Sequence, residues 1–227
     1  MRRFALAAAL SVALAGCSSG TGGSGHATVW VTRDRGAQIL HVATVPAGLT
    51  ALQGLDRVAK LKTRYGGRYV RAVDGVAEHG RTSWFYYVNG YLADQGSAEY
   101  RLRAGDVEWW DYRSWRDPLE DAVVVGAFPE PLVHGYGGER RPTVVLSGDR
   151  AALGTRIAKL VGGSVARAAP ADANVVAIVA ERTGTKRFYA QLRRPGAGSP
   201  VRFVLDPRFA ARLVSKPRLA RFRYSVP

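Results

Sequence analysis

Apolar and polar residues alternate over residues 27–45 in a pattern that predicts a β-hairpin. The runs ATVWVTR (27–33) and ILHVATV (39–45) are rich in β-branched residues, which favour strands. The turn-forming triplet DRG (34–36) separates them. We therefore expect two antiparallel strands joined by a short turn.

The residues that follow predict one helix and then three strands. Thr50 and Gln53 have the spacing of a capping box, and apolar residues continue at helical intervals, so a helix is expected over 50–62, ended by two glycines at 66–67. The sequence Asn89-Gly90 is typical of a two-residue hairpin turn. The expected strands lie at 69–74, 83–88 and 107–112. This order of elements predicts a β-grasp-like sheet with one covering helix.

Strands and helices alternate in residues 122–227 and predict a second, small α/β domain. One helix is expected from an N-cap at Ser147 to the glycines at 162–163, and a short one near 209–214. The expected strands lie at 123–125, 143–146, 174–180, 188–192, 201–205 and 222–226. The fold class expected for the whole chain is α+β.

The first seventeen residues resemble a bacterial lipoprotein signal peptide. Arg2 and Arg3 precede an apolar run over 4–15, which is shorter than the roughly 20 residues of a membrane-spanning helix. The run ends in LAGC, which is similar to a lipobox and implies that Cys17 is lipidated and residues 1–16 are removed. Residues 17–26 are expected to form a tether. The alternative is an ordinary signal peptide with an incidental cysteine.

The composition agrees with a basic, globular protein. The 227 residues carry a formal net charge of +15, and 47% of them are hydrophobic, which is enough to build a core. Most of the excess positive charge follows residue 118, so we expect a boundary near 116–122 and domains at 27–116 and 122–227. The single cysteine excludes a disulfide framework.

The distribution of the arginines bears on the choice of partners. They are dispersed in short pairs, and no nucleic-acid motif accompanies them, so nucleic acid is not an expected partner. Anionic lipids or cell-wall polymers near the anchor are the expected partners of this basic surface. The alternative is a solvated, arginine-rich surface that reflects genome composition.

Aromatic residues in the expected strands are the candidates for a binding site. Because side chains alternate along a strand, one set of Trp and Tyr side chains is assigned to one face, and Phe85, Tyr87 and Trp109 to the other. An open set would form a stacking platform for a flat ligand, a sugar or a protein. Alternatively, the second domain or residues 113–121 cover it. The candidate ligand-binding residues are Trp84, Tyr86, Asn89, Tyr91, Trp110 and Tyr112.

These residues belong to an ordered set of motifs that resembles a known family. The motifs are WFYYVNG (84–90), GS (96–97), YRL (100–102), GDV (105–107) and WW (109–110). They are similar to the transcobalamin C-terminal-like domain, a β-grasp module of bacterial surface proteins, over about 27–116. In the animal cobalamin carriers this module closes over the corrinoid as the smaller of two lobes, and this chain lacks the larger, helical lobe. The resemblance implies a corrinoid or a similar flat cofactor as the ligand.

The chain shows no motif for catalysis or metal binding. Walker, GxGxxG, HExxH and GxSxG patterns are absent from the sequence. Among the scattered histidines only His134, in a glycine-rich segment, is kept as a candidate, although a solvated side chain is the simpler interpretation. Its convergence with Glu130 or Asp121 in a cleft would favour an enzyme. Asp106 and Glu108 are expected on a face opposite to Asp111, so no cation site is predicted.

The features together predict a non-catalytic lipoprotein at the extracytoplasmic face of the cell membrane. The resemblance suggests that it binds a corrinoid or a similar flat cofactor and passes it to a membrane importer, such as an energy-coupling-factor transporter. The alternative is an adhesion or scaffold module that binds a protein or an envelope polymer. A concave site would favour the ligand-binding function, and a flat apolar patch would favour the scaffold.

Overall fold

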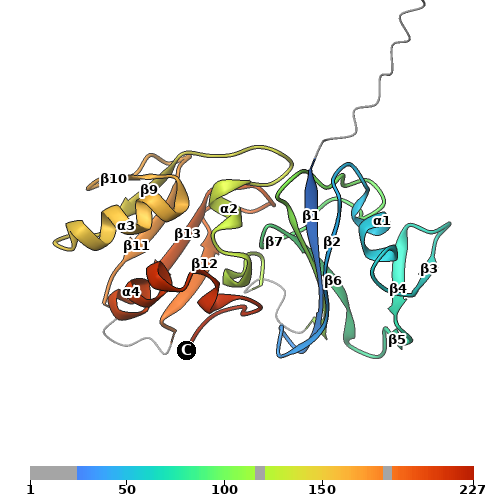
Figure 1. The fold of residues 1–227 in the computed structure, drawn as a ribbon. Helices are drawn as coiled ribbons and strands as arrows, with labels where there is room; N and C mark the ends of the chain where they lie inside the picture. Colours follow the sequence, from blue (N-terminus) through green and yellow to red (C-terminus); the bar gives the residue numbers. More distant parts are fainter. Residues whose placement is uncertain (1–24, 116–120, 181–185) are drawn as a thin grey trace, which may run out of the picture.

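The computed structural model describes residues 25–115, 121–180 and 186–227. The expected signal peptide, Cys17 and most of the tether lie outside the described residues, as does most of the expected domain boundary. We use the names N-terminal half for residues 25–115 and C-terminal half for the described residues from 121 onward. The chain has an α+β fold in which each half contributes a five-stranded sheet (Figure 1).

The sheet of the N-terminal half has the arrangement of a β-grasp sheet. Its strand order is β2-β1-β8-β6-β7, and the central strands β1 and β8 run parallel while the other neighbours are antiparallel. The expected hairpin and the turn at Asn89-Gly90 are both present, and both turn residues have the positive φ that such a turn requires. The strands are β1 (His26–Arg33), β2 (Gln38–Pro46), β6 (Thr82–Val88), β7 (Tyr91–Leu92) and β8 (Val107–Ser114).

The covering helix α1 (Ala51–Asp56) begins as expected but ends earlier. The capping box is complete, because Gln53 N–H donates to the Thr50 hydroxyl and the Gln53 side chain accepts from Thr50 N–H. The expected continuation to residue 62 is wrong. Lys60 N–H donates to the Asp74 carboxylate, and Asp74 N–H donates to the Lys60 carbonyl. These bonds draw the chain into a three-stranded sheet of β3 (Leu61–Arg64), β4 (Tyr69–Val73) and β5 (Val76–Ala77).

The sheet of the C-terminal half is mostly parallel. Its order is β10-β9-β11-β13-β12, and only the edge strand β12 runs antiparallel to its neighbour. The helices α3 and α4 pack against each other beside this sheet (Figure 1). The elements are β9 (Thr143–Leu146), α3 (Ala151–Val161), β10 (Ser164–Val165), β11 (Asn174–Ile178), β12 (Phe188–Leu192), β13 (Val201–Leu205), α4 (Pro207–Ser215) and η2 (Pro217–Ala220).

Three expectations for the C-terminal half need correction. Residues 123–125 do not form a strand, because only Val123 bridges to Tyr91 and the chain then turns into η1 (Val125–Ala127) and α2 (Glu130–Val133). The segment 222–226 is irregular and only Val226 forms a bridge. The N-cap of α3 is Arg150 rather than Ser147, since a turn at 147–150 intervenes. No helix among the described residues is long and apolar enough to cross a membrane.

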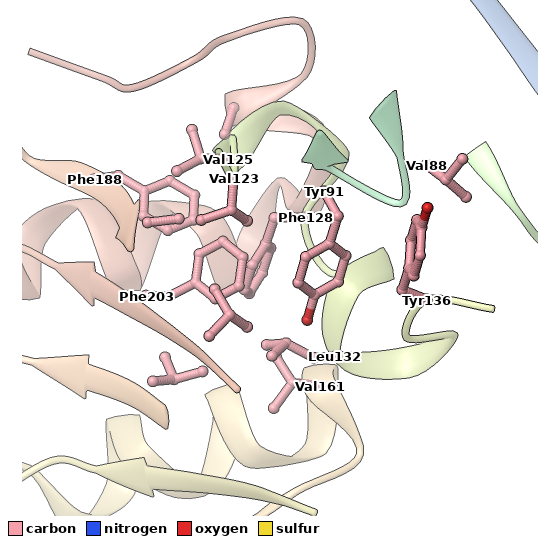
Figure 2. Close-up of a cluster of buried hydrophobic side chains, with 14 of the residues drawn as sticks. Val88, Tyr91, Val123, Val125, Phe128, Leu132, Tyr136, Val161, Phe188 and Phe203 are labelled. Carbon is pink, nitrogen blue, oxygen red and sulfur yellow. The ribbon is translucent and has the colours of Figure 1, made fainter. Parts of the chain in front are cut away.

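One hydrophobic core runs through both halves. Figure 2 shows Phe188 and Phe203 of the C-terminal half on one side of Phe128 and Tyr91 of the N-terminal half on the other, with Val88 farther away beside Tyr136. The segment from Val123 to Leu132 fills the space between them. The ring of Phe128 lies 5.4 Å from the rings of both Phe188 and Phe203. The two sheets are therefore held together by buried apolar surface, with α1 and β3–β5 on the far side of the first sheet (Figure 1).

Candidate functional site

The residues expected to bind a ligand lie inside the N-terminal half and do not form an open platform. Trp84, Tyr91 and Trp110 are 6%, 1% and 3% exposed, and Asn89 and Tyr112 are buried as well. Tyr86 is half-buried, and its ring stacks on Trp110 with 4.9 Å between centroids. A solvent-facing platform of these rings is therefore excluded, and a direct contact of the six residues with a ligand stays a prediction.

The opposite aromatic face of the same sheet is covered by the C-terminal segment. The Phe222 ring lies 4.7 Å from that of Trp30, and the Tyr224 ring lies 5.4 Å from that of Trp109 and 5.5 Å from that of Tyr87. The sequence left open whether this face forms an open platform or is covered. In the structure it is covered by the C-terminal segment of the second domain. The covering residues come from the end of the chain, about a hundred positions from the sheet that they cover.

Asn89 and Asp106 have structural roles in tying the turn to its surroundings. The Asn89 side chain donates to Asp106 at 2.7 Å and to the Gly135 carbonyl at 2.9 Å, and accepts from Val107 N–H at 2.8 Å. Asp106 also accepts from Arg103 N–H at 2.8 Å. These bonds satisfy the polar groups of the VNG and GD motifs within the protein, so the motifs are explained by the fold.

Glu108 and Asp111, the two acidic residues of β8, lie in different environments. Glu108 is fully buried, accepts from the Trp110 indole, and has its other carboxyl oxygen unpartnered among the described residues. Burial raises the pKa of Glu108 well above its ordinary value, because desolvation disfavours the charged form. Asp111 instead accepts from the Tyr224 hydroxyl at 2.9 Å and from Arg35 N–H at 3.0 Å. No group of three or more metal-ligating side chains occurs within the described ranges.

His134 approaches Glu130, but neither residue lines the concave surface at the junction of the two halves. Its Nδ1 is 2.6 Å from Glu130 Oε2, one turn apart on α2. Burial raises the pKa of Glu130, and the neighbouring His134 opposes the rise. The His134 ring also fills the space beside Gly105, where a side chain would clash with it. A packing role accounts for these contacts, and the expectation of a non-catalytic protein stays a prediction.

Ion pairs join the two halves beside a concave surface. Arg35 of the first hairpin donates to Asp121 at 2.9 Å, and the buried Arg113 of β8 lies 3.4 Å from the other oxygen of the same carboxylate. The Arg113 guanidinium also lies 4.0 Å above the Phe85 ring and donates to the Tyr87 hydroxyl at 3.1 Å. Because Asp121 is held from two sides of the N-terminal half, its position at the junction is well defined.

We call the concave surface at this junction the basic cleft, and it has a volume of about 690 Å³. Strand β12 and the loop after it form one wall, and residues 121–123 with the C-terminal segment form the other. Among the described residues that line it are four cationic side chains and one carboxylate, that of Asp121. The cationic residues are Arg35, Lys186, Arg193 and Arg194.

The sequence alone contained only a weak signal for the basic cleft. The pair Arg193-Arg194 was visible as one of several dispersed basic pairs, and the excess charge of the second half pointed to an anionic partner. However, Arg35 and Asp121 come from distant parts of the chain and meet only through the docking of the two halves. No local pattern reports such a meeting.

Comparison with known proteins relates the N-terminal half to a family without an assigned function. Residues 48–114 match the family described as a domain of unknown function (DUF4430). The matched residues include α1 and extend to the end of β8. No curated protein sequence matches the chain. Part of the chain is similar to haptocorrin in complex with Cbi, with a TM-score of 0.33 and 18% identity, over 40% of this chain and 25% of that one. A protein of Ruminococcus gnavus, proposed to bind metal, has a TM-score of 0.33 and 16% identity, over 40% of this chain and 97% of that one.

Proposed function

We propose that this protein is a lipid-anchored, extracytoplasmic, non-catalytic binding protein whose ligand occupies the basic cleft. The observation that carries the proposal is the concave surface of about 690 Å³ at the junction of the halves, a volume within the roughly 300–1,000 Å³ of ligand sites. Cationic side chains outnumber carboxylates in its lining, so a ligand with negative charge is favoured.

The anchoring part of the proposal rests on the sequence around Cys17. A lipidated cysteine and a short tether would keep the described residues close to the outer face of the membrane. Replacement of this residue by serine should release the protein from the membrane fraction into the soluble extracytoplasmic fraction. Retention of the Cys17→Ser variant in the membrane fraction would contradict the lipid anchor.

The resemblance to the transcobalamin C-terminal-like domain makes a corrinoid the first ligand to test, and an importer the first partner to seek. Because the expected aromatic residues are buried, a corrinoid is assigned to the basic cleft in this proposal, with its phosphodiester, where it has one, near Arg194. Cobalamin carries a phosphodiester and satisfies the charge requirement, whereas cobinamide lacks the nucleotide portion. Titration of both compounds separates the contribution of the phosphodiester from that of the corrin ring.

The test is a titration of the full-length protein with cobalamin, followed by tryptophan fluorescence corrected for ligand absorbance. Saturable quenching that is weakened in Arg194→Glu but retained in Arg208→Glu would support binding in the basic cleft. Arg208 is a matched control because it is an exposed arginine of α4 that does not line the cleft. Equal quenching of both variants would contradict the assignment to the cleft, and an absence of saturation would exclude a corrinoid.

One observation favours the alternative function as an adhesion or scaffold module. The edge strand β2 exposes Ile39 and Val42, which are 54% and 48% accessible, together with Leu40. An unpaired, apolar strand edge is a site at which proteins associate. A Val42→Lys variant that loses binding to envelope components while keeping the ligand titration unchanged would assign the two properties to two different surfaces.

A further inference from the structure

The edge of strand β12 lies along one wall of the basic cleft, and the chain itself shows that this edge accepts an extended segment. Phe188 N–H donates to the Val226 carbonyl at 3.2 Å, and Val226 N–H donates to the Phe188 carbonyl at 2.8 Å. This reciprocal exchange is the hydrogen-bonded pair of an antiparallel ladder. The pairing stops after this single bridge, because the Tyr224 carbonyl accepts from Val125 N–H at 3.3 Å rather than from β12.

The direction of the backbone groups along the rest of β12 follows from this bridge. On the side of β13, the Arg187 carbonyl accepts from Asp206 N–H at 2.7 Å. Arg193 N–H donates to the Pro200 carbonyl at 2.7 Å on the same side. Backbone groups alternate in direction along a strand, so the odd-numbered residues of β12 face β13. The N–H and C=O groups of Ala190 and Leu192 therefore point away from β13.

Ala190 and Leu192, the two residues with outward-pointing backbone groups, both line the basic cleft. Within the described part of the chain, no hydrogen bond beyond the β12–β13 pairing is recorded for either residue. The two residues offer two donors and two acceptors in strand geometry, next to the single bridge between Phe188 and Val226. An edge of this kind is completed by a further strand.

The charges around the edge select the chemistry of that strand. Arg193 and Arg194 follow β12 directly, Lys186 precedes it, and Arg35 faces it from the N-terminal half. A second copy of this chain pairing through β12 would bring two such cationic groups together, which is unfavourable. An acidic segment gains from the same groups, so charge complementarity favours a different, negatively charged partner.

We propose that the basic cleft binds an extended acidic peptide segment, which adds to β12 by hydrogen bonds to Ala190 and Leu192. This inference rests on the proposed function, since it names the ligand class of the same cleft. Backbone pairing supplies affinity, and the flanking cations select glutamate or aspartate in the bound segment. A corrinoid or a lipid headgroup would use the cations without needing the strand edge.

The test uses the full-length protein and a fluorescein-labelled, seven-residue peptide of alternating glutamate and valine, followed by fluorescence anisotropy. The Ala190→Pro variant removes one outward N–H, which proline at a strand edge tolerates, and Ala190→Ser keeps it. We expect the affinity to fall about tenfold in the proline variant and to change little in the serine variant. Arg194→Glu should weaken binding by a similar factor, and a lysine–valine peptide should not bind.

A change in the peptide keeps the test decisive even if Ala190→Pro does not fold. Methylation of alternate backbone nitrogens, in either of the two registers, leaves the charge intact and blocks strand pairing, so one of the two methylated peptides should lose binding. Equal binding of both methylated peptides would overturn strand addition while leaving an anion site in the basic cleft. No binding of the unmodified peptide at millimolar concentration would overturn the peptide ligand but not the corrinoid titration. A third outcome is that the protein binds anionic vesicles but not the peptide, and that Ala190→Pro leaves the vesicle binding unchanged. This outcome would overturn the peptide ligand and assign the cations to a membrane surface.

Discussion

The buried Glu108 allows a quantitative test of the packing between α1 and the first sheet. Its carboxyl group has one oxygen bonded to the Trp110 indole, and the other oxygen lies where a Cβ on Gly54 of α1 would approach to 2.7 Å. Burial raises the pKa of Glu108 well above the ordinary value of a solvated glutamate. The folded protein therefore holds Glu108 in the neutral form at a pH at which the unfolded chain ionises it.

The consequence for stability follows from proton linkage. Above a pH of about 4.3, the unfolded chain releases a proton that the folded protein retains, so the free energy of unfolding falls as the pH rises towards the folded-state pKa. The fall has a maximum slope of about 1.4 kcal/mol per pH unit. Because a single proton is involved, the loss of stability caused by Glu108 between pH 5 and pH 7 cannot exceed about 2.7 kcal/mol.

Glu108→Gln removes this linkage and keeps nearly the same shape. The glutamine can still accept the Trp110 hydrogen bond, but it does not titrate. We expect the stability of the variant, relative to the parent protein, to increase with pH by up to the same amount of about 2.7 kcal/mol over this interval. Urea unfolding of the full-length protein at pH 5, 6 and 7, followed by tryptophan fluorescence, measures this difference.

A surface glutamate provides the control for this experiment. Glu99 forms an exposed ion pair with Arg68, so Glu99→Gln should show a small difference with little dependence on pH. A stability difference between Glu108→Gln and the parent that is the same at pH 5 and pH 7 would refute the reasoning. In that case Glu108 would be ionised and solvated in the folded protein, contrary to its burial.

Three further substitutions test the junctions and the helix. Gly54→Ala should destabilise the protein by about 1–3 kcal/mol although alanine favours helices, because the added methyl group meets Glu108 and Leu102 below 3.0 Å; a gain in stability in urea would contradict this. Tyr224→Phe should cost about 1–3 kcal/mol, since buried Asp111 loses a donor at 2.9 Å. The exposed Tyr65→Phe is its control, and equal melting temperatures of the two variants would count against the role of the hydroxyl. Thr50→Ala should cost about 1 kcal/mol by thermal unfolding and Thr50→Ser little, because serine keeps the capping oxygen; equal losses would contradict the capping box.

The regular elements were largely predictable because their signals are local. The hairpin at the start, the capping box at Thr50 and the turn at Asn89-Gly90 appear where the pattern indicated. The exception within the N-terminal half is the end of α1, where apolar residues at helical spacing continue but the chain turns. Hydrogen bonds between Lys60 and Asp74, fourteen positions apart, decide that end.

The candidate binding site was less predictable, because exposure depends on the whole fold. The alternation of aromatic residues correctly indicated two aromatic faces on one sheet, but Phe222 and Tyr224 cover the second face from the far end of the chain. The concave surface that carries the proposed function lies elsewhere, at the junction where Arg35 meets Asp121. Sequence periodicity cannot report either contact.

The sequence by itself determined the class of fold and the excess of positive charge, and it predicts a lipid anchor at Cys17. Each of these depends on neighbouring residues or on composition, so it can be recognised without coordinates. Only the tertiary structure decided which aromatic face is covered, where the cations gather and which strand edge stays open. These properties arise when surfaces far apart in the chain are buried against one another, and the free energy of that burial depends on shape and on partners that no local pattern records.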